Sequence, residues 1–334
     1  MFKKTILVQL TVTALVFSSF ILAQAQTVIK YGHVASLTHP QHLGALAFAR
    51  YINEKSKGSM EVQVFPLGQL GGERSLAEQV QAGSLHVATV SSGVLANFVP
   101  EFGIIELPFV FPNKEVTYKV LEDKEVMERL AKYSDSRGFV FIGYTENGFG
   151  DMTNSKRPIK KPDDLRGLKI RVVVSPISID TFKALGANPA SLPLTEVYNA
   201  LQQKIIDGQD NSLYASVMMK FTEVNKFATI TSHILNECPV VVNNKFWKSL
   251  TPDQQKVFRE AAEVQTMVNR QAITKGSTDA IEKARAQQVD LYTLSVQDRE
   301  AFKKAVSPVY DKYKDIFDTG WYDFFLKKIG SYSK

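Results

Sequence analysis

Arg171 is a permanently charged residue within a segment that otherwise has the composition of a buried strand. Residues 168–174 alternate so that Ile170 and Val172 share one face and Arg171 lies on the other. A buried guanidinium keeps its proton and needs a hydrogen-bonded partner, because an uncompensated buried charge is costly. That partner is either an internal Asp or Glu, or a ligand carboxylate held through two parallel N–H···O bonds. The residue types leave both interpretations open.

A second polar cluster follows an amphipathic helical pattern at residues 196–204. Thr195 is predicted to cap this helix, and Gly208 follows its end. Residues 207–211 then form a short polar stretch that ends in Asn211. In open α/β sheets ligands bind at the carboxyl ends of the strands, which makes this polar stretch a candidate for ligand contact. A plain turn is the other interpretation of the same stretch.

The densest group of metal-ligand residue types is His33, His39 and His42. A metal site would require these side chains to converge, usually together with a carboxylate or thiolate. We interpret them instead as hydrogen-bonded or solvated histidines, and we predict neither a metal nor a cofactor. Cys238 is the only cysteine, which excludes an internal disulfide and a multi-cysteine zinc site. It is interpreted as a small buried hydrophobe.

Ordinary enzyme signatures are missing from the chain. It contains no G-x-S-x-G, H-E-x-x-H, P-loop or G-x-G-x-x-G pattern, and the glycine-rich turn at 68–72 lacks the Lys-Ser/Thr of a phosphate loop. The protein is therefore predicted not to be an enzyme. A secreted hydrolase stays as an alternative, and it would require an activated nucleophile with a base within reach.

The first 25 residues have the features of a secretory signal peptide. Lys3 and Lys4 precede an apolar stretch at 6–22, and Ala23-Gln24-Ala25 fits a cleavage site. We expect cleavage near Ala25 and export to the periplasm, with an uncleaved anchor as the alternative. Removing Lys3 and Lys4 lowers the net charge of the 334-residue chain from +6 to +4. The remaining charges are scattered, which argues against binding of nucleic acid or lipid surfaces.

The apolar periodicity predicts two α/β units. Strand patterns at 28–33, 60–65 and 85–90 alternate with helical patterns at 41–57 and 73–82, which favours a parallel, helix-flanked sheet. A second unit begins near Gly138, with strand patterns at 139–144, 168–174 and 240–242. From Thr251 helical spacing continues to about Ala286, which is long for a compact domain and sufficient to span two lobes. Without a disordered linker between the units, ligand space is expected between them.

Several ordered stretches resemble the DctP-type solute-binding proteins of tripartite ATP-independent periplasmic (TRAP) transporters. The resemblance covers essentially the whole mature chain and rests first on LRGLKIRV, GANP and EVYNALQQKIIDGQDN. It extends to FPLGQLGGERSLAEQVQAGSLHVA, ELPFVF, TNSKRPIKKPDDLRG, FTEVNKFATITSHI and NNKFWKSLTPDQQKV.

This resemblance implies a periplasmic binding protein-like α/β fold, with two lobes around a cleft and a long helix spanning both. Lobe one would comprise 27–148 and 237–276, and lobe two 149–236 and 277–334. Arg171 matches the family arginine that clasps the substrate carboxylate, and Asn211 matches an asparagine lining the same cleft. Weaker correspondences, for which a structural role is an equal alternative, fall on Glu73, Ser91, Leu194, Phe149, Tyr214, Asn236 and His33.

One departure from the family pattern bears on specificity. Many relatives carry Arg or Lys in the segment where this chain has Gly150. The resemblance therefore implies one carboxylate held by Arg171 and neutral polar contacts at the other end of the ligand, which favours a monocarboxylate over a dicarboxylate.

The function implied is capture of a small organic acid by closure of the lobes of a monomer, followed by delivery to membrane permease subunits. A sensor that presents the same closed shape to a membrane receptor is the alternative from another class. Neighbouring genes for permease subunits would distinguish the two.

Overall fold

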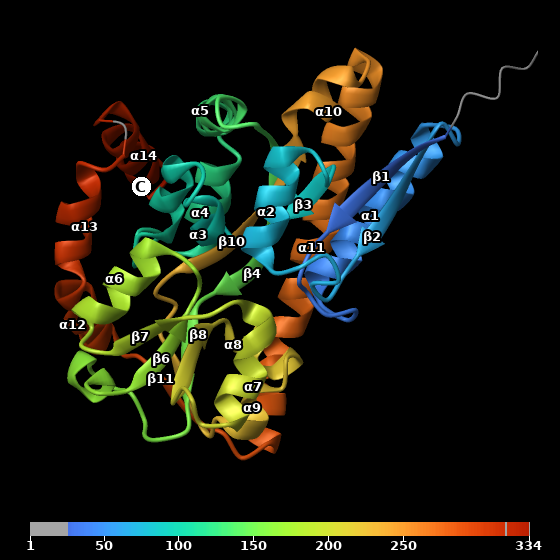
Figure 1. The fold of residues 1–334 in the computed structure, drawn as a ribbon. Coiled ribbons are helices and arrows are strands. Elements are labelled where there is room, and N and C mark those ends of the chain that lie inside the picture. The colour runs from blue at the N-terminus through green and yellow to red at the C-terminus, as the bar shows by residue number, and fades with distance from the viewer. Residues whose placement is uncertain (1–25, 318, 334) are drawn as a thin grey trace, which may run out of the picture.

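The computed structural model describes residues 26–317 and 319–333, which form two lobes built on two β-sheets (Figure 1). The first sheet has the strand order β2-β1-β3-β10-β4. Strands β1 and β2 are parallel, as are β1 and β3, whereas β10 runs antiparallel to both β3 and β4. The predicted parallel arrangement is therefore confirmed for the first three strands, within a mixed sheet. The strands are β1 Thr27–Gly32, β2 Met60–Phe65, β3 Val87–Thr89, β4 Phe139–Phe149 and β10 Leu235–Asn243.

The second sheet has the strand order β11-β9-β5-β8-β6-β7. Its strands β6, β7 and β8 are parallel to one another, and β5 runs antiparallel to β8 and β9. Residues 207–211, for which a plain turn was one interpretation, mostly form strand β8. The strands are β5 Asp151–Asn154, β6 Lys169–Val172, β7 Asn188–Ser191, β8 Gly208–Asn211, β9 Phe227–Ile230 and β11 Asp290–Thr293.

Helix α11, Pro252–Ala286, runs along both lobes (Figure 1). It packs on α1 and β4 of lobe one and on α8 of lobe two. Thr251 caps its first turn in a capping box with Gln254, and the proline at its first position removes one N–H that would have no partner within the helix. The predicted long helix spanning two α/β lobes is therefore confirmed. No helix among the described residues is long and apolar enough to cross a membrane.

Shorter helices flank the two sheets. Thr195, predicted as a helix cap, lies instead inside the short turn η3, and α7 begins without any side-chain cap. The prediction was wrong because a 3₁₀ turn precedes the helix and already fixes its first residues. The elements are α1 Pro40–Lys55, α2 Glu73–Ala82, α3 Ser92–Leu95, η1 Pro100–Glu106, α4 Lys114–Leu121, α5 Lys124–Asp135, η2 Pro162–Leu165, α6 Pro176–Ala184, η3 Leu194–Glu196, α7 Val197–Gln202, α8 Leu213–Met218, α9 Phe221–Val224 and α10 Asn244–Ser249.

The C-terminal helices contact both lobes. Helix α13, Ser307–Lys314, packs on α6 of lobe two, whereas α14, Thr319–Tyr332, packs on α4 of lobe one. The indole of Trp321 in α14 donates a hydrogen bond to the carbonyl of Glu101, and Lys328 pairs with Asp123. We therefore propose that the division of the chain places α14 in lobe one, rather than in lobe two with the rest of 277–334. Helix α12, Val296–Ala305, precedes them.

The largest hydrophobic cluster extends across the boundary between the lobes. It contains Phe102 and Phe141 from lobe one and Ile177 and Phe182 from lobe two. The side-chain amide of Asn97 donates a 2.8 Å hydrogen bond to the carbonyl oxygen at position 174, from one lobe to the other. The lobes are therefore in contact beside the cleft.

Candidate functional site

A pocket of about 300 Å³ lies where the two lobes meet. Glu73 and Val94 contribute from lobe one, and Arg171 and Leu194 from lobe two. Three residues predicted as ligand contacts, Glu73, Arg171 and Leu194, therefore line the same cavity. The complete lining is Gly72, Glu73, Arg74, Ser75, Glu78, Val94, Arg171, Val173, Val174, Pro193 and Leu194.

Arg171 lies in β6 with only 4% of its surface exposed. Its Nε–H donates a 2.9 Å hydrogen bond to the carbonyl oxygen of Leu192, and Nη1 donates a 3.5 Å bond to that of Asp210. No carboxylate of residues 26–317 and 319–333 forms an ion pair with it. Burial lowers the pKa of Arg171 to about 10, against the opposing charges of Asp210 and Glu73, so the side chain stays charged at neutral pH. Two of the five guanidinium N–H groups are used, which leaves donors for a carboxylate.

Glu73 is held in the pocket by Ser91. Its carboxylate accepts hydrogen bonds from the backbone N–H of Ser91 at 3.1 Å and from the hydroxyl at 2.8 Å. Burial raises the pKa of Glu73, and the two bonds and the charge of Arg171 partly offset this rise. Ser91 thus fixes the orientation of Glu73 and does not itself line the pocket.

Asn211 ends strand β8, beside the strand that carries Arg171. Arg171 is paired in register with Gln209, so Asn211 lies two residues further along on the same face of the sheet. The side-chain oxygen of Asn211 accepts a hydrogen bond from the N–H of Ser212, while its amide nitrogen has no partner among the described residues. Asn211 therefore offers a hydrogen-bond donor close to the arginine strand.

Phe149 and Tyr214 line a second, smaller cavity of about 170 Å³ instead of the first. The Tyr214 ring also packs against the His39 ring, with 5.8 Å between centroids. The cavity lining is Asn147, Gly148, Phe149, Asp151, Ser212, Leu213, Tyr214, Ile230, Ser277 and Ile281.

The histidines near the N-terminus have protein partners. His33 Nε2 lies 3.1 Å from His42 Nδ1, and His33 Nδ1 accepts a hydrogen bond from the N–H of Ala35. His39 caps α1 by accepting from the N–H of Gln41. Burial, together with the charges of His42 and His39, lowers the pKa of His33 to about 3. Within the described ranges no three metal-ligand side chains converge, and His33 lines neither cavity.

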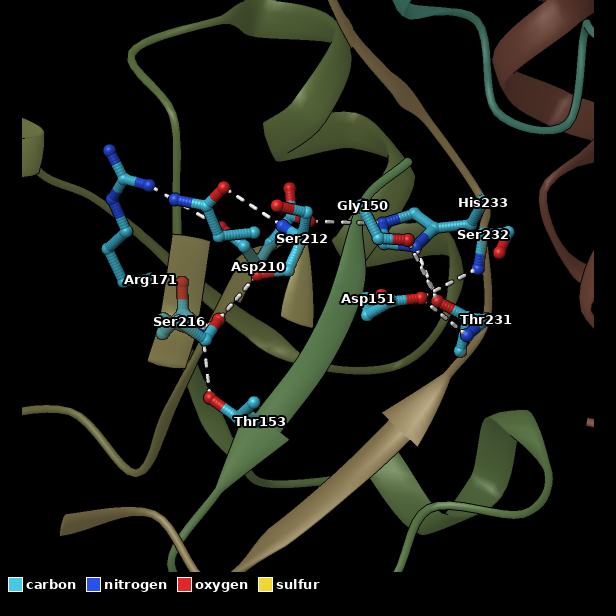
Figure 2. A network of polar contacts seen from close by, with 12 residues as sticks. Gly150, Asp151, Thr153, Arg171, Asp210, Ser212, Ser216, Thr231, Ser232 and His233 are labelled. Carbon is cyan, nitrogen blue, oxygen red and sulfur yellow. Dashed lines mark hydrogen bonds and ion pairs between the residues drawn. The ribbon is translucent and has the colours of Figure 1, made fainter. Parts of the chain in front are cut away.

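A buried polar cluster surrounds Gly150, and sequence reasoning did not find it. Figure 2 shows Asp210, Gly150 and His233 beside one another, with Arg171 on the other side of Asp210. His233 Nε2 lies 3.4 Å from Asp210 Oδ1, and neither atom has a hydrogen-bond partner. On the other side of its ring, His233 Nδ1 lies 2.7 Å from the hydroxyl of Thr231.

The titratable groups of this cluster have strongly displaced pKa values. Burial raises the pKa of Asp210 to about 7, against the charge of Arg171. Burial, followed by the charges of Asp210 and Glu73, raises the pKa of Glu106 to about 8. Burial lowers the pKa of His233 to about 3, so its imidazole is neutral. The second aspartate of the D-G-Q-D-N segment is the one signal in the sequence that marks this cluster, because β alternation buries it.

Gly150 leaves room for no larger residue without adjustment. A Cβ atom there would lie 2.9 Å from Asp210 Oδ1 and 3.3 Å from Asn236 Nδ2. Asn236 Nδ2 is buried and without a partner. The predicted contact Asn236 therefore lies beside Gly150, in the polar cluster, and not in the lining of the 300 Å³ pocket.

Known proteins resemble this chain over most of its length. The sequence profile of the bacterial extracellular solute-binding proteins, family 7 (DctP), matches residues 31–315. The 2,3-diketo-L-gulonate-binding periplasmic protein YiaO of Escherichia coli is 31% identical, over 86% of each chain. The crystal structure of the sugar acid binding protein DctPAm from Advenella mimigardefordensis with galactonate superposes with a TM-score of 0.88 at 30% identity, covering 92% of this chain and 99% of the other. The crystal structure of a TRAP periplasmic solute-binding protein from Sulfurospirillum deleyianum with bound succinate superposes with a TM-score of 0.84 at 32% identity. The superposition covers 92% of this chain and 99% of the other.

Proposed function

Because the chain belongs to family 7 of the bacterial extracellular solute-binding proteins, we propose that Arg171 clasps the carboxylate of a small organic acid between its two lobes. The chain is a solute-binding protein of the TRAP type. The single observation that carries the role of Arg171 is that this buried cation faces a pocket and has no carboxylate partner among the described residues. The related proteins with known ligands bind organic acids: 2,3-diketo-L-gulonate, galactonate and succinate.

Closure of the lobes on the acid is the proposed mechanism. Glu73 belongs to lobe one and Arg171 to lobe two, so a ligand in the pocket contacts both lobes only when they are together. Such a ligand favours the closed form by its differential contacts, since equal affinity for both forms would shift nothing. Asn211 supplies a further donor from lobe two.

The closed, loaded protein then delivers its ligand to membrane permease subunits. We propose that it acts as a monomer in the periplasm after cleavage near Ala25. Residues 1–25 lie outside the described residues, so the leader assignment rests on sequence. N-terminal sequencing of the exported protein tests the cleavage position, and sedimentation at micromolar concentration tests the monomer.

Thermal-shift screening of organic acids tests the central proposal. A ligand present at 100 times its dissociation constant adds about 2.7 kcal/mol of stability, which is readily measured. We expect at least one carboxylic acid to stabilise the wild type but not Arg171→Ala. The matched control is Arg166→Ala, which removes a guanidinium that is 80% exposed in the same lobe and should respond like the wild type.

An Arg171→Ala protein that every active acid stabilises as much as the wild type would exclude the arginine clasp. The bound acid should also be recovered chemically unchanged after incubation. Turnover would instead support the hydrolase alternative.

A further inference from the structure

Glu106 is an acidic residue buried at the boundary between the lobes. It is the last residue of η1 in lobe one, it is 1% exposed, and its Oε2 atom has no hydrogen-bond partner among the described residues. The point that a Cβ atom of Gly93 would occupy lies 3.0 Å from this oxygen and 3.1 Å from the hydroxyl oxygen of Ser175, which caps α6 of lobe two. The carboxyl group of Glu106 is therefore enclosed by both lobes, and separation of the lobes removes part of its cover.

No cation compensates for this carboxyl group. Glu106 forms no ion pair with any lysine, arginine or histidine of the described residues. The titratable side chains that act on it are Asp210 of β8, Glu73 of α2 and Cys238 of β10. Helix α3, which packs on η1, carries no charged residue. Charged side chains on the other helices packed against η1 are engaged elsewhere: Asp180 of α6 pairs with Lys312, Arg129 of α5 lies over the ring of Phe324, and Lys328 of α14 pairs with Asp123.

The arginine of the pocket is shared among several acids. The charge of Arg171 lowers the pKa of Asp210 and that of Glu73, and the charges of these two acids in turn raise the pKa of Glu106. A ligand carboxylate that pairs with Arg171 offsets the guanidinium charge, so the three acids lose their counter-charge. Carboxylates that lie close together in a buried site disfavour each other's ionised form. The added anion therefore favours the uptake of a proton by one of them.

Glu106 is the acid whose surroundings change most when the lobes close. Asp210 lies in the same sheet as Arg171, and its backbone carbonyl accepts a hydrogen bond from the guanidinium (Figure 2). The two hydrogen bonds from Ser91 favour the charged form of Glu73. Glu106 has neither kind of support among the described residues. Burial, followed by the charges of Asp210 and Glu73, raises its pKa from 4.5 to about 8 when the lobes are together. Water that enters between separated lobes brings this pKa back towards its ordinary value.

We propose, on the basis of the function proposed above, that the protein takes up a proton when its lobes close on an organic acid, and that Glu106 is the residue that binds this proton. The proton offsets the negative charge that the ligand brings into the site. Capture of the acid is then linked to pH. Because the complex binds more protons than the free protein between pH 4.5 and about 8, the affinity for the acid falls as the pH rises through this range.

Calorimetry in buffers of different ionisation enthalpy counts this proton directly. The probes are galactonate and erythronate, the ligands of two related proteins, because their carboxyl groups are already ionised at pH 6.5. The dependence of the observed binding enthalpy on the buffer gives the number of protons taken up. We expect about one proton for each acid bound at pH 6.5, and about tenfold weaker binding for each unit of pH between 5.5 and 7.5.

A neutral variant assigns the proton to its residue. Glu106→Gln keeps the shape of the side chain and removes its titration, so it should take up less than about half as much of a proton as the wild type, and its affinity should change by about threefold or less over the same pH range. Glu115→Gln, at an acid of lobe one whose side chain is 75% exposed, should keep the wild-type proton count. No uptake by the wild type, or equal uptake by Glu106→Gln and the wild type, would overturn the proposal.

The two proposals fail separately in these experiments. If the wild type binds without proton uptake while Arg171→Ala does not bind, the proton proposal is wrong and the arginine clasp stands. If Arg171→Ala binds both acids as the wild type does, the clasp itself is wrong. Should Glu106→Gln fail to fold, the proton count of the wild type still decides the outcome.

Small-angle scattering of the ligand-free protein decides the outcome if neither acid binds. Closure that takes up a proton is favoured at low pH, so the wild type should be more compact at pH 5.5 than at pH 8.5. Glu106→Gln should have the same radius of gyration at both pH values. A wild type whose radius of gyration is also the same at both would overturn the proposal.

Discussion

Arg171 and Glu73 line one pocket from opposite lobes without forming an ion pair. Their charges attract across the cavity, and each displaces the pKa of the other towards the charged form. Ser91 holds the Glu73 carboxylate away by two hydrogen bonds, so the arginine keeps free donors. In an ordinary protein core, an internal carboxylate would pair with Arg171. Here that pairing remains open to the carboxylate of a ligand that enters between the lobes.

Truncating Arg171 should have the largest effect on affinity. Arg171→Ala is expected to weaken binding of the best organic acid by about 2–5 kcal/mol, the range for removing one member of a buried charge pair. Arg171→Lys should recover only part of this loss, because an ammonium cannot form the two parallel bonds. Calorimetry checks both variants. Equal affinity for the Lys variant and the wild type would contradict two-point recognition.

Asn211→Ala should cost less than Arg171→Ala, about 1–3 kcal/mol, if its free amide donates to the ligand. The exposed Asn188, on strand β7 of the same sheet, gives the control variant Asn188→Ala. Calorimetry with the same acid should separate the two variants by about fivefold or more. Identical dissociation constants for both would place Asn211 outside the binding site.

Asp210 should make the ligand-free protein less stable as the pH rises. Burial raises its pKa from 3.8 to about 7, so the folded state binds more protons than the unfolded state between these values. Stability contributed by the protonated form is present below pH 4 and is lost as the pH rises through 7. Asp210→Asn should therefore raise the melting temperature at pH 8 relative to the wild type and change it little at pH 4.

Differential scanning calorimetry of wild type and variant at both pH values measures this. Buried His33 and His233 have lowered pKa values, so they reduce stability at acid pH, in the opposite direction to Asp210. Because both proteins contain these histidines, the difference between their melting temperatures reports on Asp210 alone. Equal pH profiles for the two proteins would show that Asp210 ionises normally.

Gly276 permits a close contact between α11 and lobe two. A Cβ atom there would lie 2.2 Å from the ring of Tyr214. Although alanine favours helix, Gly276→Ala should destabilise the protein by about 1–3 kcal/mol, as expected for overpacking. Urea unfolding should show this loss, and adding Tyr214→Ala to the variant should recover part of it. Destabilisation that simply adds in the double variant would show that the loss does not arise from contact with the Tyr214 ring.

The sequence predicted the elements that have strong periodicity and clear end signals. Thr251, Pro252 and the continuous helical spacing defined α11 within a residue, and the alternation at 60–65 defined β2. Helices α4 and α5, between the ELPFVF stretch and Gly138, were not predicted, because each is short and buries only a few apolar side chains. Short strands such as β8 contain too few residues for the alternation of apolar and polar side chains to distinguish them from turns.

The candidate site was only partly accessible to the same reasoning. Arg171 could be identified from the sequence, because a charged residue within an apolar strand is uncommon and needs a partner. Glu106, Asp210 and His233 lie far apart in sequence and meet only where the lobes meet, so no local pattern marks their proximity. The sequence showed that Gly150 replaces the Arg or Lys of many relatives. How little space surrounds this position became clear only from the atoms around it in the structure.

The proposed place of α14 in lobe one has a consequence for the mechanics of the molecule. Within the described part of the chain, the polypeptide passes between the lobes at Gly150, at residues 231–234, along α11 and again from α13 to α14. In Figure 1 the α12–α14 segment lies at the left edge of the molecule, and helix α11 lies to the right of the second sheet. Chain crossings at several places thus restrain the opening of the two lobes. This favours a small hinge rotation and limits how wide the space between the lobes can become around a bulky solute.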